Sequence, residues 1–211
     1  MLQMLMMGLF LLQAQGLKEG GADLLWLETI SAPEEFKAAA EAFSHIALPW
    51  VGTMSFDTAG RTMMGTSPAE MVELISSIPN KPMVFGANCG TGAPDLLRTI
   101  QDFAKSSPNR ILIAKGNAGI PKYVDGQILY DGTPELMAKY AVMARNSGAK
   151  MIGGCCGTKP EHLSSMRAAL ESDVLGPVPS LKQVELEIGP FSSKIRKEIK
   201  QHKSKRRRHR V

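Results

Sequence analysis

The chain has 211 residues, of which 44% are hydrophobic and 21% charged, a composition that fits a globular protein and excludes a largely disordered one. Its net charge of +5 is concentrated at one end, because residues 194–211 hold ten Lys or Arg and one Glu. The whole chain has 25 basic and 20 acidic residues. Without residues 194–211 it has 15 basic and 19 acidic residues, which gives a net charge of −4. Three cysteines leave one unpaired in any disulfide scheme, which indicates a reducing compartment, and we expect the cytoplasm.

The N-terminal segment MLQMLMMGLFLLQAQGLKEGG is strongly apolar. It has no basic residue before Lys18 and no convincing small-residue cleavage site, and the apolar run is too short to span a bilayer. We therefore expect neither a secretory signal nor a membrane anchor. The pattern instead predicts a buried helix that ends at Gly20 and Gly21.

Short apolar runs then alternate with longer segments of helical pattern. The predicted strands are residues 23–28, 48–54, 82–88, 110–116 and 150–154. The predicted helices are residues 33–45, 67–77, 93–105, 133–147 and 159–172. Several of these helices follow a capping residue with Pro and an acidic residue, as in TSPAE and DGTPE. This alternation predicts an α/β fold with a parallel sheet.

Chemically reactive residues stand where the predicted strands end. Glu28 ends the first strand, Asn88 and Cys89 the third, Asn117 the fourth, and Cys155 and Cys156 the fifth. The carboxyl ends of parallel strands meet at one edge of a sheet, where the βα loops carry functional groups. The sequence therefore predicts one site built from these strand ends.

Three cysteines at two strand ends suggest a metal centre. Thiolates in a reducing cell are well matched to zinc, which has no redox chemistry of its own. A structural zinc site normally has four protein ligands, so three would leave a position for water or substrate and would indicate catalysis. The alternative is that Cys89, Cys155 and Cys156 are small buried residues, and the spacing alone leaves both interpretations open.

The segments GANCG, KGNAGIPKY and IGGCCGTKPEHL, in this order, resemble the homocysteine S-methyltransferase family from about Gln13 to Leu170. The resemblance implies a (β/α)8 TIM-type barrel in which Cys89, Cys155 and Cys156 hold Zn²⁺. It also implies that the sulfur of homocysteine takes the open position on the metal as a thiolate and accepts a methyl group, which yields methionine.

The same resemblance extends to further residues. It implies that Glu28 holds the substrate amino group and that Asn117 occupies the fourth position of the metal until homocysteine displaces it. The alternatives are that Glu28 caps the next helix and that Asn117 holds a turn. His162 is expected to be a solvated helix residue and not a ligand.

The chain departs from the family in length, because it shows five predicted strands and a closed barrel has eight. By resemblance the missing strands are the first three, so we expect an incomplete barrel of about five βα units. Residues 1–175 would form the homocysteine-binding portion, and residues 176–211 a C-terminal extension with a disordered basic tail. Exposed sheet edges favour association, so a homo-oligomer is expected.

The sequence leaves two questions about function open: which methyl donor is used, and what the basic tail does. The segments TMSFDTAGRTMMG and GNAGIPKYVDG resemble the corresponding sequences of betaine-type enzymes, which makes betaine the expected methyl donor. The alternative function is a catalytically inactive barrel fragment or binding module whose basic tail contacts RNA or another polyanion. The tail has no aromatic residue to stack on bases, so nucleic acid is not the expected partner.

Overall fold

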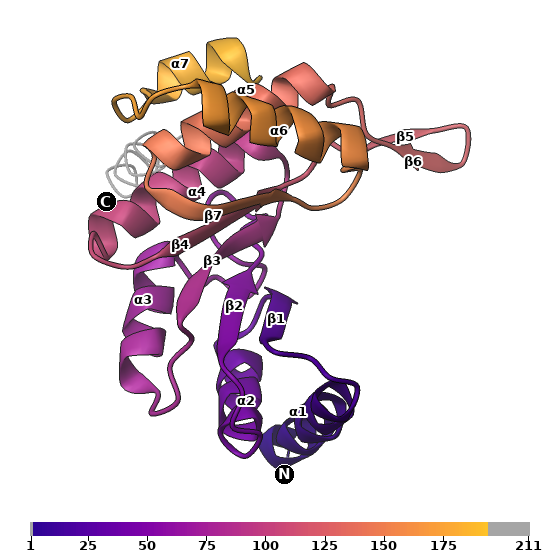
Figure 1. The fold of residues 1–211 in the computed structure, drawn as a ribbon, viewed down its shortest axis with the longest axis vertical. Helices are drawn as coiled ribbons and strands as arrows, with labels where there is room; N and C mark the ends of the chain where they lie inside the picture. Colours follow the sequence, from indigo (N-terminus) through magenta and orange to yellow (C-terminus); the bar gives the residue numbers. More distant parts are fainter. Residues whose placement is uncertain (1, 194–211) are drawn as a thin grey trace, which may run out of the picture.

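The computed structural model describes residues 2–193, in which helices and strands alternate (Figure 1). The helices are α1 Leu2–Glu19, α2 Pro33–Ser44, α3 Pro68–Ser77, α4 Ala93–Ser106, α5 Pro134–Asn146, α6 Pro160–Ser172 and α7 Leu181–Glu187. The strands are β1 Leu25–Ile30, β2 Trp50–Met54, β3 Val84–Cys89, β4 Leu112–Gly116, β5 Lys122–Val124, β6 Gln127–Leu129 and β7 Ala149–Gly154. The predicted βα alternation is confirmed.

Five strands form one parallel sheet in the order β1-β2-β3-β4-β7, and β5 and β6 form a separate antiparallel hairpin. Each strand of the main sheet lies next to its successor, as in a TIM-type barrel, where crossover helices connect neighbouring parallel strands. All five strands end at the same edge of the sheet. The βα loops therefore gather there, and the hairpin, which lies in the loop between β4 and α5, projects from the body (Figure 1).

The two faces of the sheet differ. The helices pack against one face, and the main core there includes Phe36 and Phe103 from helices and Phe85 from β3. The other face carries a small apolar cluster of Val51, Val84 and Ile113 with Met151 packed against it, all from strands. We call this second side the inner face, because in a barrel it would point to the axis. Polar residues beside this cluster thus have room to meet a ligand.

Local sequence signals set the helix starts. Five helices, α2 to α6, begin with Pro in the first turn, where a missing N–H costs nothing. In α3, Ser67 caps the helix by accepting from the Glu70 N–H, and the Glu70 carboxylate accepts from the Ser67 N–H at 2.7 Å. This capping box is the one that TSPAE predicts.

Two local predictions of secondary structure need correction. Glu28 does not end the first strand, because β1 continues to Ile30 through a register irregularity at which Thr29 has a φ of 63°. The hairpin of β5 and β6 was not predicted. Its residues are exposed, so no buried face imposes an alternating pattern on them.

Helix α1 was correctly predicted as a helix, but the prediction that it is buried is wrong. Ala14 is its one buried residue, and the helix packs against α2 through half-buried side chains such as Phe10. Its other apolar side chains are exposed: Leu2, Met4, Leu5, Leu9, Leu12 and Leu17. An apolar run on all sides of a helix cannot indicate which side meets the core. In the part of the chain that the structure describes, no helix has both the length and the apolar character needed to span a bilayer.

The segment after α6 lies along the helical layer. Val184 of α7 is fully buried in the main core, and Gln101 of α4 donates to the Pro179 carbonyl at 2.9 Å. Further along, the Ser192 N–H donates to Asp95 at 2.9 Å, and Asp95 also pairs with Arg98. The segment thus follows α4 toward its N-terminus. The basic tail, residues 194–211, lies outside the described residues.

Candidate metal centre

The three cysteines lie together at the carboxyl edge of the sheet. Their Sγ atoms are all within 4.8 Å of one another, with 3.8 Å between Cys89 and Cys156 and 3.9 Å between Cys155 and Cys156. None of them forms a disulfide. Cys156 is exposed and the other two are half-buried, so the cluster is open to solvent on one side. The structure therefore brings together the three residues that the sequence singled out.

Strand β4 sets the spacing between the two cysteine segments. In the sheet register, Gly116 of β4 pairs with Cys89 on one side and with Gly154 on the other. The Cys155 N–H then donates to the Gly116 carbonyl at 2.8 Å. Cys89 has a φ of 59°, in the left-handed region that costs a residue other than Gly about 1 kcal/mol or more. This strained turn at the end of β3 is part of the geometry that places its thiol beside Cys156.

The proximity of the thiols separates their pKa values. The pKa of Cys155 is lowered to about 5 by its neighbours, chiefly the Cys89 thiol and then the Asn88 side chain, whose Nδ2 lies 3.7 Å from the Cys155 sulfur. The pKa of Cys89 is raised well above its usual range by the neighbouring Cys155 sulfur and by burial. The cluster alone thus favours one thiolate and resists the formation of more.

This donor set fits a soft divalent cation. A divalent cation held by the three sulfurs would offset the mutual repulsion of the thiolates and allow all three thiols to ionise. Three thiolates are a common ligand set of zinc, and Asp or Glu oxygens, which harder cations prefer, are not part of the cluster. The residues present therefore suit Zn²⁺ with one coordination position left over.

Asn117 is buried directly behind the cluster. Its Oδ1 accepts from the Cys156 N–H at 3.1 Å, and its Nδ2 donates to the Gly90 carbonyl at 3.1 Å. The side chain thus bridges the two loops that carry the cysteines. In this arrangement Asn117 holds the loops in place, which is the turn-holding role that the sequence left open beside metal contact.

Asn88 connects the cluster to strand β1. Its Oδ1 accepts from the Thr29 N–H at 3.0 Å, while its Nδ2 donates to Thr29 Oγ1 at 2.7 Å and lies 3.7 Å from Cys155 Sγ. The side chain is fully buried. The sequence placed Asn88 at a strand end but gave it no role, because its partner Thr29 is 59 residues away along the chain.

Glu28 lies next to Thr29, on the inner face of β1. Its carboxylate forms an ion pair with Lys115 of β4, and the Lys115 ammonium also lies 4.8 Å from the centre of the Trp26 ring. The exposed fractions of the two charged side chains are 37% for Glu28 and 22% for Lys115. Lys115 was not predicted as a site residue. A charged residue within the predicted strand 110–116 could have indicated that its side chain faces a polar part of the inner face.

Tyr130 is a second residue that the sequence did not single out. It follows β6, and partial burial together with the nearby Cys156 thiol raises the pKa of its hydroxyl. Its ring lies on the backbone of Gly157, where an added Cβ would come within 2.3 Å of Tyr130 Cγ. Gly157 also has a φ of 75°, so glycine is required there for two reasons. The hairpin thus brings an aromatic hydroxyl to the thiols.

The prediction that His162 is solvated is wrong, because the side chain is 6% exposed. Nδ1 accepts from the Lys159 N–H at 2.8 Å, so Nε2 carries the proton and donates to the Gly132 carbonyl at 2.9 Å. Gly132 in turn donates to the Ala118 carbonyl at 2.9 Å. His162 therefore fastens the start of α6 to the base of the hairpin and is not part of the thiol cluster.

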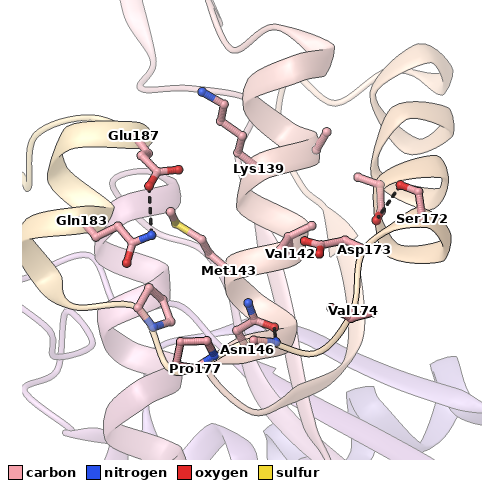
Figure 2. Close-up of a pocket in the computed structure, with 14 residues that line it drawn as sticks. Lys139, Val142, Met143, Asn146, Ser172, Asp173, Val174, Pro177, Gln183 and Glu187 are labelled. Atoms are coloured by element: carbon pink, nitrogen blue, oxygen red, sulfur yellow. Dashed lines mark hydrogen bonds between the residues drawn. The ribbon is translucent and has the colours of Figure 1, made fainter.

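A cavity of about 500 Å³ lies elsewhere, between α5, the end of α6 and the segment that includes α7 (Figure 2). Its lining includes Lys139, Asn146 and Asp173, and the Gln183 amide donates to Glu187 at its rim (Figure 2). None of the three cysteines lines it. The candidate site is therefore the open thiol cluster and not this cavity.

A parallel βα sheet that gathers three thiols at its carboxyl edge defines part of a TIM-type barrel with a candidate soft-metal centre. The sequence profile of homocysteine S-methyltransferases matches residues 4–170, which is most of the chain. The protein belongs to the homocysteine S-methyltransferase family.

Solved structures of a homocysteine methyltransferase are similar to this fold. The homocysteine methyltransferase MmuM from Escherichia coli, in its apo, oxidized and metallated forms, superposes with TM-scores of 0.62, 0.63 and 0.62 at 22% identity. The match covers 77% of this chain and 57%, 52% and 51% of those chains. The chain thus spans little more than half the length of these structures, and the likeness establishes the fold.

Proposed function

We propose that this chain carries the zinc-binding and homocysteine-binding portion of a methyltransferase that converts homocysteine to methionine. The observation that supports this function best is the cluster of three Sγ atoms within 4.8 Å of one another in a member of the homocysteine S-methyltransferase family. In this proposal Cys89, Cys155 and Cys156 are the zinc ligands. Glu28 binds the substrate ammonium, and Asn117 serves the site by holding the ligand loops.

The chemistry follows from these ligands. When bound, Zn²⁺ supplies the positive charge that keeps a coordinated homocysteine sulfur deprotonated at neutral pH. The sulfur then forms a bond to a methyl carbon, while the bond from that carbon to the donor nitrogen breaks and its electron pair stays on nitrogen. With betaine, the proposed donor, the products are methionine and dimethylglycine. The protein contributes mainly by holding the two reactants in line.

The organisation of the chain belongs to the same proposal. Residues 1–175 form the barrel portion, and residues 176–211 form an extension whose described part follows α4. The three free cysteines fit a reducing compartment such as the cytoplasm. The exposed apolar side of α1 and the edge strand β1 support a homo-oligomer.

The first prediction tests the ligand set. Wild-type protein purified with zinc should hold about one ion per chain, and Cys89→Ser, Cys155→Ser and Cys156→Ser should each weaken zinc binding at least about tenfold, because two thiolates are too few to retain the ion. Zinc content is measured by atomic emission, and affinity by competition with a chromophoric chelator.

The matched control is Met64→Ser, which removes a sulfur that is exposed and outside the cluster. This variant should keep its zinc. Retention of stoichiometric zinc by a double variant without Cys155 and Cys156 would overturn the proposed function.

A further inference from the structure

Three residues form a polar group on the inner face of the sheet, close to the thiols. Trp26 and Glu28 are two residues apart on β1, on the side opposite the buried Leu25 and Leu27. Lys115 follows Ile113 of the inner cluster by two residues on β4, so the alternation of a strand places it on the same face. The ion pair of Lys115 and Glu28 thus bridges the inner face from β1 to β4.

The sheet register places this pair directly below the cysteines. Lys115 pairs with Asn88, and Asn88 Nδ2 lies 3.7 Å from Cys155 Sγ. The next residue of β4, Gly116, pairs with Cys89 and accepts from the Cys155 N–H. On β1, Glu28 precedes the Thr29 that bonds to Asn88. The backbone positions of both residues therefore lie within about one strand residue, roughly 3.3 Å along a strand, of the level at which Cys89 ends β3.

The charges of this pair restrict which ligand can bind. A ligand that brings only an ammonium to Glu28 would displace Lys115 and leave a partly shielded cation without its partner, which is costly. A ligand with both an ammonium and a carboxylate on one carbon exchanges one ion pair for two, and no charge is left unpaired. The Trp26 ring, 4.8 Å from the Lys115 ammonium, holds that cation near the site during the exchange.

We propose that Lys115 binds the α-carboxylate of homocysteine while Glu28 binds its ammonium, so that this ion pair selects an α-amino acid as the thiol substrate. The inference rests on the proposed function, because it needs the substrate sulfur at the cysteine cluster. It adds a specificity-determining residue, Lys115, to the site.

The experiment measures thiol binding to the full chain loaded with Co²⁺, in which a sulfur-to-cobalt absorption band reports a fourth thiolate without any turnover. Three ligands are titrated: homocysteine, 3-aminopropane-1-thiol, which lacks the carboxylate, and 4-mercaptobutyrate, which lacks the ammonium. Wild type should prefer homocysteine to the carboxylate-free thiol by about tenfold or more. Lys115→Met should bind homocysteine about tenfold more weakly and lose that preference, but keep its preference over 4-mercaptobutyrate.

The control is Lys105→Met, which removes a lysine from an exposed ion pair with Asp102 on α4 and should bind all three thiols as wild type does. An unchanged homocysteine preference in Lys115→Met would overturn the inference and leave the proposed function standing. So would a Lys115→Met variant that binds homocysteine normally but requires more betaine, since the lysine would then hold the donor carboxylate. If wild type takes up cobalt and binds none of the thiols, the proposed function itself fails and the inference with it.

Discussion

At the residue scale, the position of Tyr130 near the thiols depends on one glycine. Gly157 follows Cys156, and the lack of a side chain there lets the Tyr130 ring rest on the backbone. The hydroxyl thereby lies near Cys156, whose thiol adds to the effect of burial in raising the pKa of Tyr130. A hydrogen bond to a metal-bound thiolate takes up part of its charge and fixes its orientation, and loss of such an outer contact typically costs 10-fold to 100-fold in metal affinity.

We predict from this position that Tyr130→Phe binds zinc about tenfold more weakly than wild type, because the variant keeps the ring on Gly157 and loses only a hydroxyl near the thiols. Competition with a chelator measures the change. Tyr123→Phe is the matched control, since Tyr123 lies on the same hairpin with its side chain in solvent, and its zinc affinity should not change. Identical affinities for Tyr130→Phe and wild type would show that the hydroxyl does not act on the bound metal.

At the scale of elements, the helix starts are encoded locally and respond to pH. Glu70 accepts from the backbone and hydroxyl of Ser67 and pairs with Arg61, and these contacts lower its pKa to about 2. The folded pKa is below the value of about 4.3 for an unfolded chain. The capping box therefore stabilises α3 fully above about pH 4.5 and loses this effect as the pH falls toward 2.

The expected result for Glu70→Gln is a lower free energy of unfolding than wild type at pH 6, with a difference that shrinks as the pH is lowered toward 3. The difference is small, because the Glu70 side chain is 55% exposed and solvent screens its contacts. Urea unfolding at several pH values measures it. Glu73→Gln makes the same change of charge in α3 outside the capping box and serves as the control. A Glu70→Gln difference that stays constant with pH would contradict the assignment.

Whether a feature depends on local or on distant contacts explains how much of it the sequence could predict. The strands and helices carry their own signals, in apolar runs and in Pro and acidic residues at helix starts, and the structure confirms them to within two residues for most boundaries. The thiol cluster was predictable because parallel strands end at one edge. The pairing of Glu28 with Lys115 was not, since it joins residues 87 apart, and the burial of His162 depends on a carbonyl 30 residues away.

At the scale of the whole molecule, the exposed apolar side of α1 is unusual for a surface helix. Leu5 and Leu12 are 62% and 72% exposed on this helix, next to the edge strand β1. Contiguous apolar surface of this kind normally meets another protein surface. An open parallel sheet adds unpaired backbone groups at the same end of the molecule.

The double variant Leu5→Lys/Leu12→Lys should therefore associate less than wild type, because two charges on the outer side of α1 oppose its burial between copies. Sedimentation velocity over a range of concentrations measures the association. Leu186→Lys, at an exposed position of α7 far along the chain, is the control and should associate as wild type does. Wild type that stays monomeric at all concentrations would remove the basis for a homo-oligomer.

The separation of the cysteines along the chain also sets an order of events during synthesis. Cys89 and Cys156 are 67 residues apart, and β4 must lie between β3 and β7 before their sulfurs can meet. A nascent chain that has emerged only as far as β4 presents one thiol at this edge, too few to retain zinc. Under the proposed function, metal uptake follows completion of the sheet, and a pulse of labelled zinc during translation would mark the moment at which β7 joins it.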